Sequence, residues 1–363
     1  MEGLMLKKWV HLLLLLFLLI AGLYYARPFL VPLAFAGLMA MLFFPVSRWL
    51  ENRGVHKVVA ILLCILVLLL VASAIFGLLY WQVSDVAKDA GRIEKNLVRQ
   101  LEELRHYISR SFGISEHQQR QFLNSGSYTG LGDTFSRLLL GLGSLVADVV
   151  LFLVYLFLFL YSRSHLKKFV LMLLPPGRQK NAAALMSNCS RVAQKYLSGL
   201  TAMIACLWVL YAIGFSIVGV ENAIFFAILC GLLEIVPFVG NLTGNAITIL
   251  MVFAQGGSPA MVLGVIVTYF SIQFFQTYVL EPLVVGAGVN INPLFTIAGL
   301  VAGELIWGIP GMVLAIPVLG IAKIICDNVE GLNPYGFLLG MEKREKPHGS
   351  LEWLKKWFSR SKA

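Results

Sequence analysis

Residues 222–254 read NAIFFAILCGLLEIVPFVGNLTGNAITILMVFA, an apolar run interrupted in its middle by Glu234, Pro237 and Gly240. A straight helix of this length would be roughly 50 Å long, whereas the hydrocarbon core of a membrane is about 30 Å thick. Proline and glycine interrupt the hydrogen bonding of a helix. The run therefore predicts a long tilted helix, a broken helix or a re-entrant hairpin.

Residues 293–326 repeat the pattern, with a break that runs from Glu304 through Gly308 and Pro310 to Gly311. Two interrupted apolar runs of opposite orientation are typical of transporters, because half-helix ends and free backbone groups can bind a substrate or an ion. The alternative is that proline and glycine only kink closely packed helices. Counting both runs as spans gives about eight spans, and counting both as hairpins gives about six.

The composition of the whole chain agrees with a membrane location. The 363 residues are 58% hydrophobic and only 13% charged, with a mean hydropathy of +0.81. A soluble domain carries about 25% charged residues. These values argue against a soluble enzyme, a nucleic-acid-binding protein and a disordered chain. They predict an all-α polytopic membrane protein of about eight transmembrane segments, two of them broken or re-entrant.

Hydropathy and charge divide the chain into four regions. Residues 1–82 contain the N-terminal transmembrane helices, and residues 83–137 form an amphipathic helical insert outside the cytoplasm. Residues 138–327 form a C-terminal transmembrane core that contains both interrupted runs. Residues 328–363 are a cytoplasmic tail, in which residues 351–358 predict an amphipathic membrane anchor. Lys and Arg beside the spans place both termini in the cytoplasm.

The C-terminal core lacks positive charge over most of its length. From Tyr196 through Ala322 there is no Lys or Arg, but four acids remain: Glu221, Glu234, Glu281 and Glu304. Burying an unpaired carboxylate in an apolar run is costly unless it takes up a proton or a cation. We therefore interpret Glu234 and Glu304 as proton- or cation-coupling sites. Glu281 precedes Pro282 and could simply end a helix.

Further polar side chains lie in the same region. Tyr269, Gln273 and Gln276 recur at helical spacing on an apolar run, where they could line a water-filled path or bind a neighbouring helix. Asn241 and Asn245, one turn apart, leave the same two alternatives. The predicted substrate path comprises Pro237, Gly240, Asn241, Asn245, Tyr269, Gln273, Gln276, Glu281, Gly308, Pro310 and Gly311.

The sequence contains no pattern that indicates catalysis. A phosphate-binding P-loop and a zinc-protease motif are both missing, the five cysteines form no CxxC pair, and the six histidines do not cluster. We therefore expect no catalytic residue, no metal site and no cofactor. The missing P-loop also argues against transport driven by ATP.

The motifs resemble those of the autoinducer-2 exporter family. The segment 234–241, EIVPFVGN, is similar to the family signature E-x-x-P-x-x-G-P, and segments 281–286 and 308–317 are similar to later family motifs. Asn241 departs from the proline that is usual in the family. The resemblance implies a multi-pass transporter of a bacterial inner membrane that forms a homo-oligomer, such as a pentamer.

Residues and resemblance together predict a secondary transporter that exports a small polar solute or a signalling molecule such as autoinducer-2. The alternatives are a sodium(cation)/proton antiporter, and a passive oligomeric channel or non-transporting membrane scaffold. The expected partners are a small-molecule or ion substrate, membrane lipid and further copies of the chain. Nucleic acid is not among them.

Overall fold

The computed structural model describes residues 2–88, 96, 99, 131–236, 239–285 and 291–341. These residues are helical throughout, apart from short connections and a backbone bridge between Ile291 and Gly340. The helices are α1 (Glu2–Tyr25), α2 (Arg27–Asn52), α3 (Lys57–Lys88), α6 (Leu131–Met172), η1 (Pro176–Arg178), α7 (Gln179–Val218), α8 (Ala223–Leu233), α9 (Val239–Ala254), α10 (Pro259–Phe275), η2 (Gln276–Val285), α11 (Pro293–Trp307), α12 (Ile309–Asn328) and α13 (Asn333–Leu339).

Seven of these helices are long and apolar enough to cross a membrane, and α8, α9 and α11 are shorter apolar helices. The predicted all-α polytopic fold is therefore confirmed. Most of the predicted insert at 83–137 and the predicted anchor at 351–358 lie outside the described residues.

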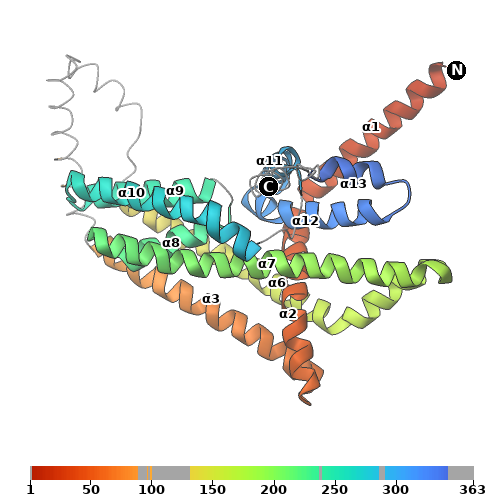
Figure 1. The fold of residues 1–363 in the computed structure, drawn as a ribbon, viewed down its shortest axis with the longest axis horizontal. Coiled ribbons are helices and arrows are strands. Elements are labelled where there is room, and N and C mark those ends of the chain that lie inside the picture. The colour runs from red at the N-terminus through yellow and green to blue at the C-terminus, as the bar shows by residue number, and fades with distance from the viewer. Residues whose placement is uncertain are drawn as a thin grey trace, which may run out of the picture.

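Helices α1 and α2 follow one another around a kink at Ala26 (Figure 1). Helical hydrogen bonds continue through this kink, from Ala26 N to Gly22 O at 2.9 Å and from Leu30 N to Ala26 O at 2.9 Å. Two prolines close to the kink, Pro28 and Pro32, both lie within α2. Pro28 is tolerated because the first turn of a helix has no intrahelical partner for its backbone N–H groups.

Helices α2, α3 and α6 pack around a small apolar cluster of Ala36, Ala40, Ile61, Leu156 and Leu160. The alanines let the helices approach closely, as small residues do in membrane bundles. A long helix, α7, then runs past α2 and along the whole molecule (Figure 1). Its C-terminal half carries the largest cluster of buried apolar side chains, which it shares with α8, α9 and α10.

The first interrupted run, 222–254, forms a helical hairpin. Helices α8 and α9 fold back on each other, so that Cys230 Sγ lies 3.6 Å from Thr248 Oγ1. At the closed end, Gly240 lies against the backbone carbonyl of Leu233, where any Cβ would collide with the oxygen. A hairpin is one of the three structures that the sequence allows for this run.

The second interrupted run, 293–326, forms a hairpin of the same kind. Helices α11 and α12 meet backbone to backbone at Gly303 and Gly311, where neither residue has room for a Cβ. The turn between the helices is Gly308, whose φ of 68° is a conformation that favours glycine.

The closed end of the first hairpin touches the side of the second hairpin. Val236, just beyond α8, packs against Leu300 of α11 and against Met312 and Ala315 of α12. Figure 1 shows α8, α9 and α10 on one half of the molecule and α11, α12 and α13 on the other, with α7 crossing both. The two runs that the sequence identifies as interrupted thus converge at the middle of the structure.

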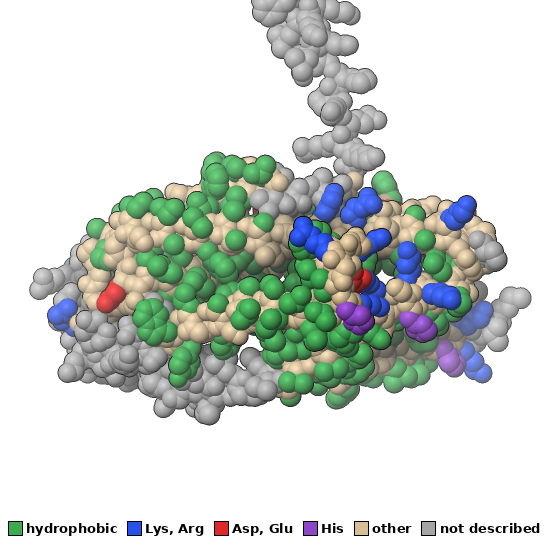
Figure 2. Space-filling view, turned by 90° about the horizontal axis from the view of Figure 1, so that it is seen from below, with side chains coloured by type: hydrophobic (Ala, Val, Ile, Leu, Met, Phe, Trp, Pro, Cys, Tyr) green, Lys and Arg blue, Asp and Glu red, His purple; other side chains and the backbone are tan. Residues whose placement is uncertain are grey.

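Positive charge is distributed unevenly over the surface. Figure 2 shows most of the Lys and Arg gathered toward one end of the face in view, while many hydrophobic side chains are exposed elsewhere on it. The block from Tyr196 through Ala322, which includes α8, α9, α10 and α11, contributes no Lys or Arg to this surface.

Candidate functional site

A buried group of hydrogen-bonded polar side chains lies between α7, α9 and α10, and we refer to it as the polar cluster. Its centre is Asn241, one turn before Asn245 on the buried face of α9. Tyr211 of α7 donates its hydroxyl to Asn241 Oδ1 at 3.1 Å. Asn245 Nδ2 donates to Asn241 Oδ1 at 3.0 Å and to the Tyr211 hydroxyl at 3.3 Å. Asn241 Nδ2 donates to Gln273 Oε1 of α10.

Glu234 forms the second part of the polar cluster. It is the residue that ends α8, so the closed end of the first hairpin places its carboxyl inside the bundle, where it is 8% exposed. Gln276 Nε2 donates to Glu234 Oε1 at 2.7 Å, and Gln276 is itself 1% exposed. The sequence pattern indicates Glu234 and Gln276 as separate candidates, and their hydrogen bond is a finding of the structure.

Gln276 is also the first residue of a π-helix that extends to Val285. The apolar run that carries Tyr269, Gln273 and Gln276 thus changes its helical winding at the residue that contacts Glu234. Wide helical turns of this kind are rare and often occur at functional sites, because they move a side chain out of the register of an α-helix.

The electrostatics of the polar cluster favour a positively charged or hydrogen-donating ligand. No ion pair within the described ranges involves Glu234, and the carboxyl lies at the C-terminal, negative end of α8. Asn245 Oδ1 and Gln276 Oε1 are buried and accept no hydrogen bond from the described residues. Buried acceptors without a donor are unfavourable, so a proton, a cation or a ligand hydroxyl would stabilise the site.

The predicted path residues Gly308 and Gly311 make their backbone contacts within the second hairpin, and no hydrogen bond among the described residues joins them to the polar cluster. Gly308 N donates to Glu304 O at 2.7 Å, and Gly311 is buried at the contact with Gly303. The side chains of Glu304 and Glu281 are exposed. Among the described residues, neither side chain forms a hydrogen bond with a member of the polar cluster.

The structure brings together five of the residues that the sequence predicts for the site: Glu234, Asn241, Asn245, Gln273 and Gln276. Tyr269 lies half-buried one turn before Gln273, Gly240 and Pro310 lie at the hairpin turns, and Pro237 lies outside the described residues.

Two members of the site were not predicted from the sequence. Tyr211 is buried at 1% exposure, and Thr248 is fully buried beside Cys230. Tyr211 is a lone polar side chain in an apolar stretch of α7 and carries no spacing signal, although a polar group in an apolar run is itself a reason to look for a partner. Thr248 follows Asn241 and Asn245 at helical spacing on the buried face of α9, so the pattern could have identified it.

Comparison with known proteins gives consistent matches over most of the chain. A family model described as "AI-2E family transporter" matches residues 13–331. "Putative transport protein YueF" of Bacillus subtilis (strain 168) is 25% identical over 373 residues, which cover 94% of this chain and 100% of that protein. YhhT of Escherichia coli (strain K12), named in the same way, is 25% identical over 342 residues, which cover 92% of this chain and 95% of that protein.

Proposed function

Since the chain belongs to the AI-2E transporter family, we propose that it is a secondary transporter that exports a small polar solute or signalling molecule and uses Glu234 as its coupling site. Membrane transport follows from the family and from the apolar helices. The direction, the substrate and the coupling role of Glu234 are the proposal.

The observation that carries the proposal is the isolation of the Glu234 carboxyl. It is buried among apolar helices with one donor, Gln276, among the described residues, in a block without Lys or Arg. A negatively charged carboxylate is unfavourable there, whereas a proton-bound or cation-bound one is tolerated. Binding of a proton or a cation to Glu234 would therefore favour the closed state of the polar cluster, and its loss would favour a state open to water. Such a dependence of conformation on binding is required for coupled transport.

The two hairpins supply a way to change access. They meet through the apolar contact of Val236 with Leu300, Met312 and Ala315. Apolar side chains have no directional hydrogen bonds to break, so such a contact can slide at small cost. We propose that the hairpins are re-entrant from opposite sides, so that movement at their meeting point opens the polar cluster to one side at a time.

A cation/proton antiporter is the second candidate, and the chemistry of the polar cluster favours it specifically. The carboxyl of Glu234 and the unpartnered amide oxygens of Asn245 and Gln276 are all oxygen acceptors. Oxygen ligands are those that hard cations prefer. In this version sodium would be the cargo that exchanges with protons at Glu234.

The proposal is tested in proteoliposomes that contain the purified full-length protein. One arm follows efflux of autoinducer-2 under an imposed proton gradient, and the other follows internal pH after addition of sodium. We expect Glu234→Gln to abolish gradient-driven flux in the active arm. Glu330→Gln should leave flux unchanged, because Glu330 forms only an exposed ion pair with Arg178.

Gradient-driven flux that persists in Glu234→Gln with an unchanged pH profile would show that the carboxyl has no coupling role. Flux through the unaltered protein that ignores every gradient would instead support a passive channel. Glu304→Gln belongs in the same series, because the sequence proposes Glu304 as a second coupling site and the structure places its side chain at the surface.

We further propose, from the family resemblance, a homo-oligomer in the inner membrane with both termini in the cytoplasm. The gathering of Lys and Arg toward one end of the molecule supports that orientation (Figure 2). The side chains of α1 from Trp9 to Ile20 are exposed along its length, and lipid or a neighbouring copy would cover them.

A further inference from the structure

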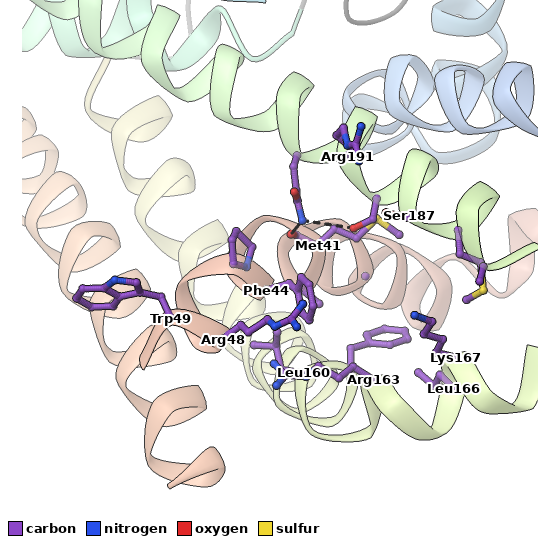
Figure 3. A pocket seen from close by; sticks show the side chains of 18 of the residues that line it. Met41, Phe44, Arg48, Trp49, Leu160, Arg163, Leu166, Lys167, Ser187 and Arg191 are labelled. Carbon is purple, nitrogen blue, oxygen red and sulfur yellow. Dashed lines mark hydrogen bonds between the residues drawn. The ribbon is translucent and has the colours of Figure 1, made fainter. Parts of the chain in front are cut away.

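A cavity of about 740 Å³ lies between α2, α6 and α7, far from the polar cluster. Its α7 lining ends at Gln194, which lies roughly 25 Å before Tyr211 along that helix. Figure 3 shows side chains from all three helices arranged around this space. We refer to it as the basic cavity.

The lining of the basic cavity has an apolar end and a charged end. On α2, Gly37, Ala40 and Met41 are followed two turns later by Arg48. On α6, Leu160 is followed two turns later by Lys167. The same change from apolar to basic on two neighbouring helices produces a cavity with a hydrophobic tail region and a cationic head region.

Most of the positive charge at the head region has no acidic partner among the described residues. Among the basic lining residues, Arg163 is paired with Glu51. Arg48, Lys167 and Arg191, one from each helix, form no ion pair with an acid of the described ranges. No Asp or Glu lines the cavity. Three cations that face one space without a counter-charge favour an anionic ligand.

We propose that the basic cavity binds an anionic phospholipid, with its phosphate between Arg48, Lys167 and Arg191 and an acyl chain along the apolar end. Guanidinium and ammonium groups are the usual protein ligands of phosphate. Basic pockets between membrane helices on the cytoplasmic side are suited to anionic head groups. The inference does not depend on the proposed transport function.

The apolar end argues for a lipid over a soluble anion. A soluble phosphate ester carries polar groups that need partners, but the inner wall presents Ala40, Met41 and Leu160. The polar side chain nearest to that wall, Gln194, already donates to Met41 O at 2.8 Å and to Ser190 Oγ at 3.3 Å.

The rim also has the character of a membrane interface. Trp49 lines the cavity, and the guanidinium of Arg53 stacks on its ring at 3.9 Å from the centroid. Tryptophan is enriched at the head-group level of membranes, where its ring is apolar and its N–H is polar. A lipid in the basic cavity would therefore have its phosphate at the depth that phosphates occupy in the bilayer.

The test uses the delipidated full-length protein in detergent. Phosphatidylglycerol and phosphatidylcholine with identical acyl chains are titrated separately, and binding is followed by native mass spectrometry and thermal unfolding. We expect phosphatidylglycerol to bind and to raise the unfolding temperature. The triple variant Arg48→Gln, Lys167→Gln, Arg191→Gln should bind it on the order of 100-fold more weakly. The matched control is Lys168→Gln, which removes an exposed neighbouring charge outside the lining.

Three results would overturn the proposal: equal binding of phosphatidylglycerol and phosphatidylcholine, undiminished binding by the triple variant, or equally tight binding of glycerol 3-phosphate. The last would assign the basic cavity to a soluble phosphate ester.

A second variant keeps the test decisive if the triple variant does not fold. Gly37→Leu places a side chain in the apolar end, where the nearest atom to the new Cβ is a Phe159 ring carbon at 3.8 Å. We expect this variant to weaken binding of phosphatidylglycerol and to leave the charged rim intact. Undiminished lipid binding by Gly37→Leu would contradict an acyl chain at that end.

Discussion

Gln276 has two roles in the polar cluster: its amide nitrogen donates a hydrogen bond to Glu234, and its amide oxygen remains available to accept one from a ligand. Its amide nitrogen bonds the Glu234 carboxyl at 2.7 Å, while its amide oxygen is buried without a donor among the described residues. The carboxyl and the amide therefore act as one unit, and changing either residue alters the environment of the other.

Gln276→Met tests this unit, because methionine keeps the length of the side chain and removes the amide. We expect a loss of about 1–3 kcal/mol of stability from the unpaired Glu234 carboxyl, together with impaired gradient-driven flux. Thermal unfolding and proteoliposome flux measure the two effects. Tyr278→Phe, two residues away and exposed, is the control, and equal behaviour of both variants would argue against the pairing.

The glycine contacts of the hairpins give a second prediction for single residues. In Gly303→Ala or Gly311→Ala the new methyl group would meet the backbone of the facing helix. Overpacking of this kind typically destabilises by about 1–3 kcal/mol. Gly77→Ala serves as the control, since nothing lies within 4 Å of the new Cβ on α3. Unfolding temperatures that fall equally in all three variants would contradict the backbone contact.

Asn241 shows how a departure from the family pattern changes a site. The family usually has proline here, and the first turn of α9 would accept it, because the backbone N–H groups of that turn need no intrahelical partner. The asparagine side chain instead joins Tyr211, Asn245 and Gln273. The asparagine thus makes hydrogen bonds at this position that a proline side chain could not make.

For the two hairpins, the sequence indicates where the apolar runs are interrupted but not how the helices on either side pack. Gly308 indicates where one helix stops, and the structure ends α11 before it and begins α12 after it, whereas Gly240 lies within the first turn of α9. These glycines do not indicate the direction of the next helix, which depends on contacts such as that between Gly303 and Gly311. The π-helix that starts at Gln276 has no sequence signature that we could recognise.

The hairpin arrangement predicts which connections share a side of the membrane. Single cysteines at Glu221 and Ala260, at the open end of the first hairpin, should react with an impermeant thiol reagent from the same side. A cysteine at Glu330, beyond α12, should react from the opposite side. The background needs the native cysteines replaced by alanine. Labelling of Glu221→Cys and Ala260→Cys from opposite sides would show that α8 and α9 together cross the membrane.

At the scale of the whole molecule, α1 extends from the bundle and is fastened to it at few points (Figure 1). One of them is the hydrogen bond from Trp307 Nε1, at the end of α11, to Leu23 O at 2.9 Å. The sequence indicates α1 clearly, because its apolar stretch is long and follows Lys7 and Lys8 near the start of the helix. Its attachment depends on a residue far along the chain and could not be predicted.

Trp307→Phe should loosen this attachment, since phenylalanine keeps an aromatic ring and removes the N–H donor. We expect faster hydrogen exchange of the α1 backbone next to the kink, with exchange in α2 and α6 unchanged. Trp208→Phe is the control, because the Trp208 N–H bonds Ile228 O within another pair of helices. Unchanged exchange around Leu23 in Trp307→Phe would show that the hydrogen bond does not hold α1.

The bond between Leu23 and Trp307 also has a consequence for biosynthesis. Its two residues are separated by 284 positions, so at about 5–20 residues per second α1 leaves the ribosome tens of seconds before Trp307 exists. During that time α1 must reside in the membrane without its contact to Trp307. The leucines from Leu12 to Leu16 and the exposed apolar side chains up to Ile20 make this possible, because lipid can cover every face of such a helix. The exposed apolar surface of α1 therefore also keeps this helix stable in the membrane until Trp307 has been synthesised and can bind it.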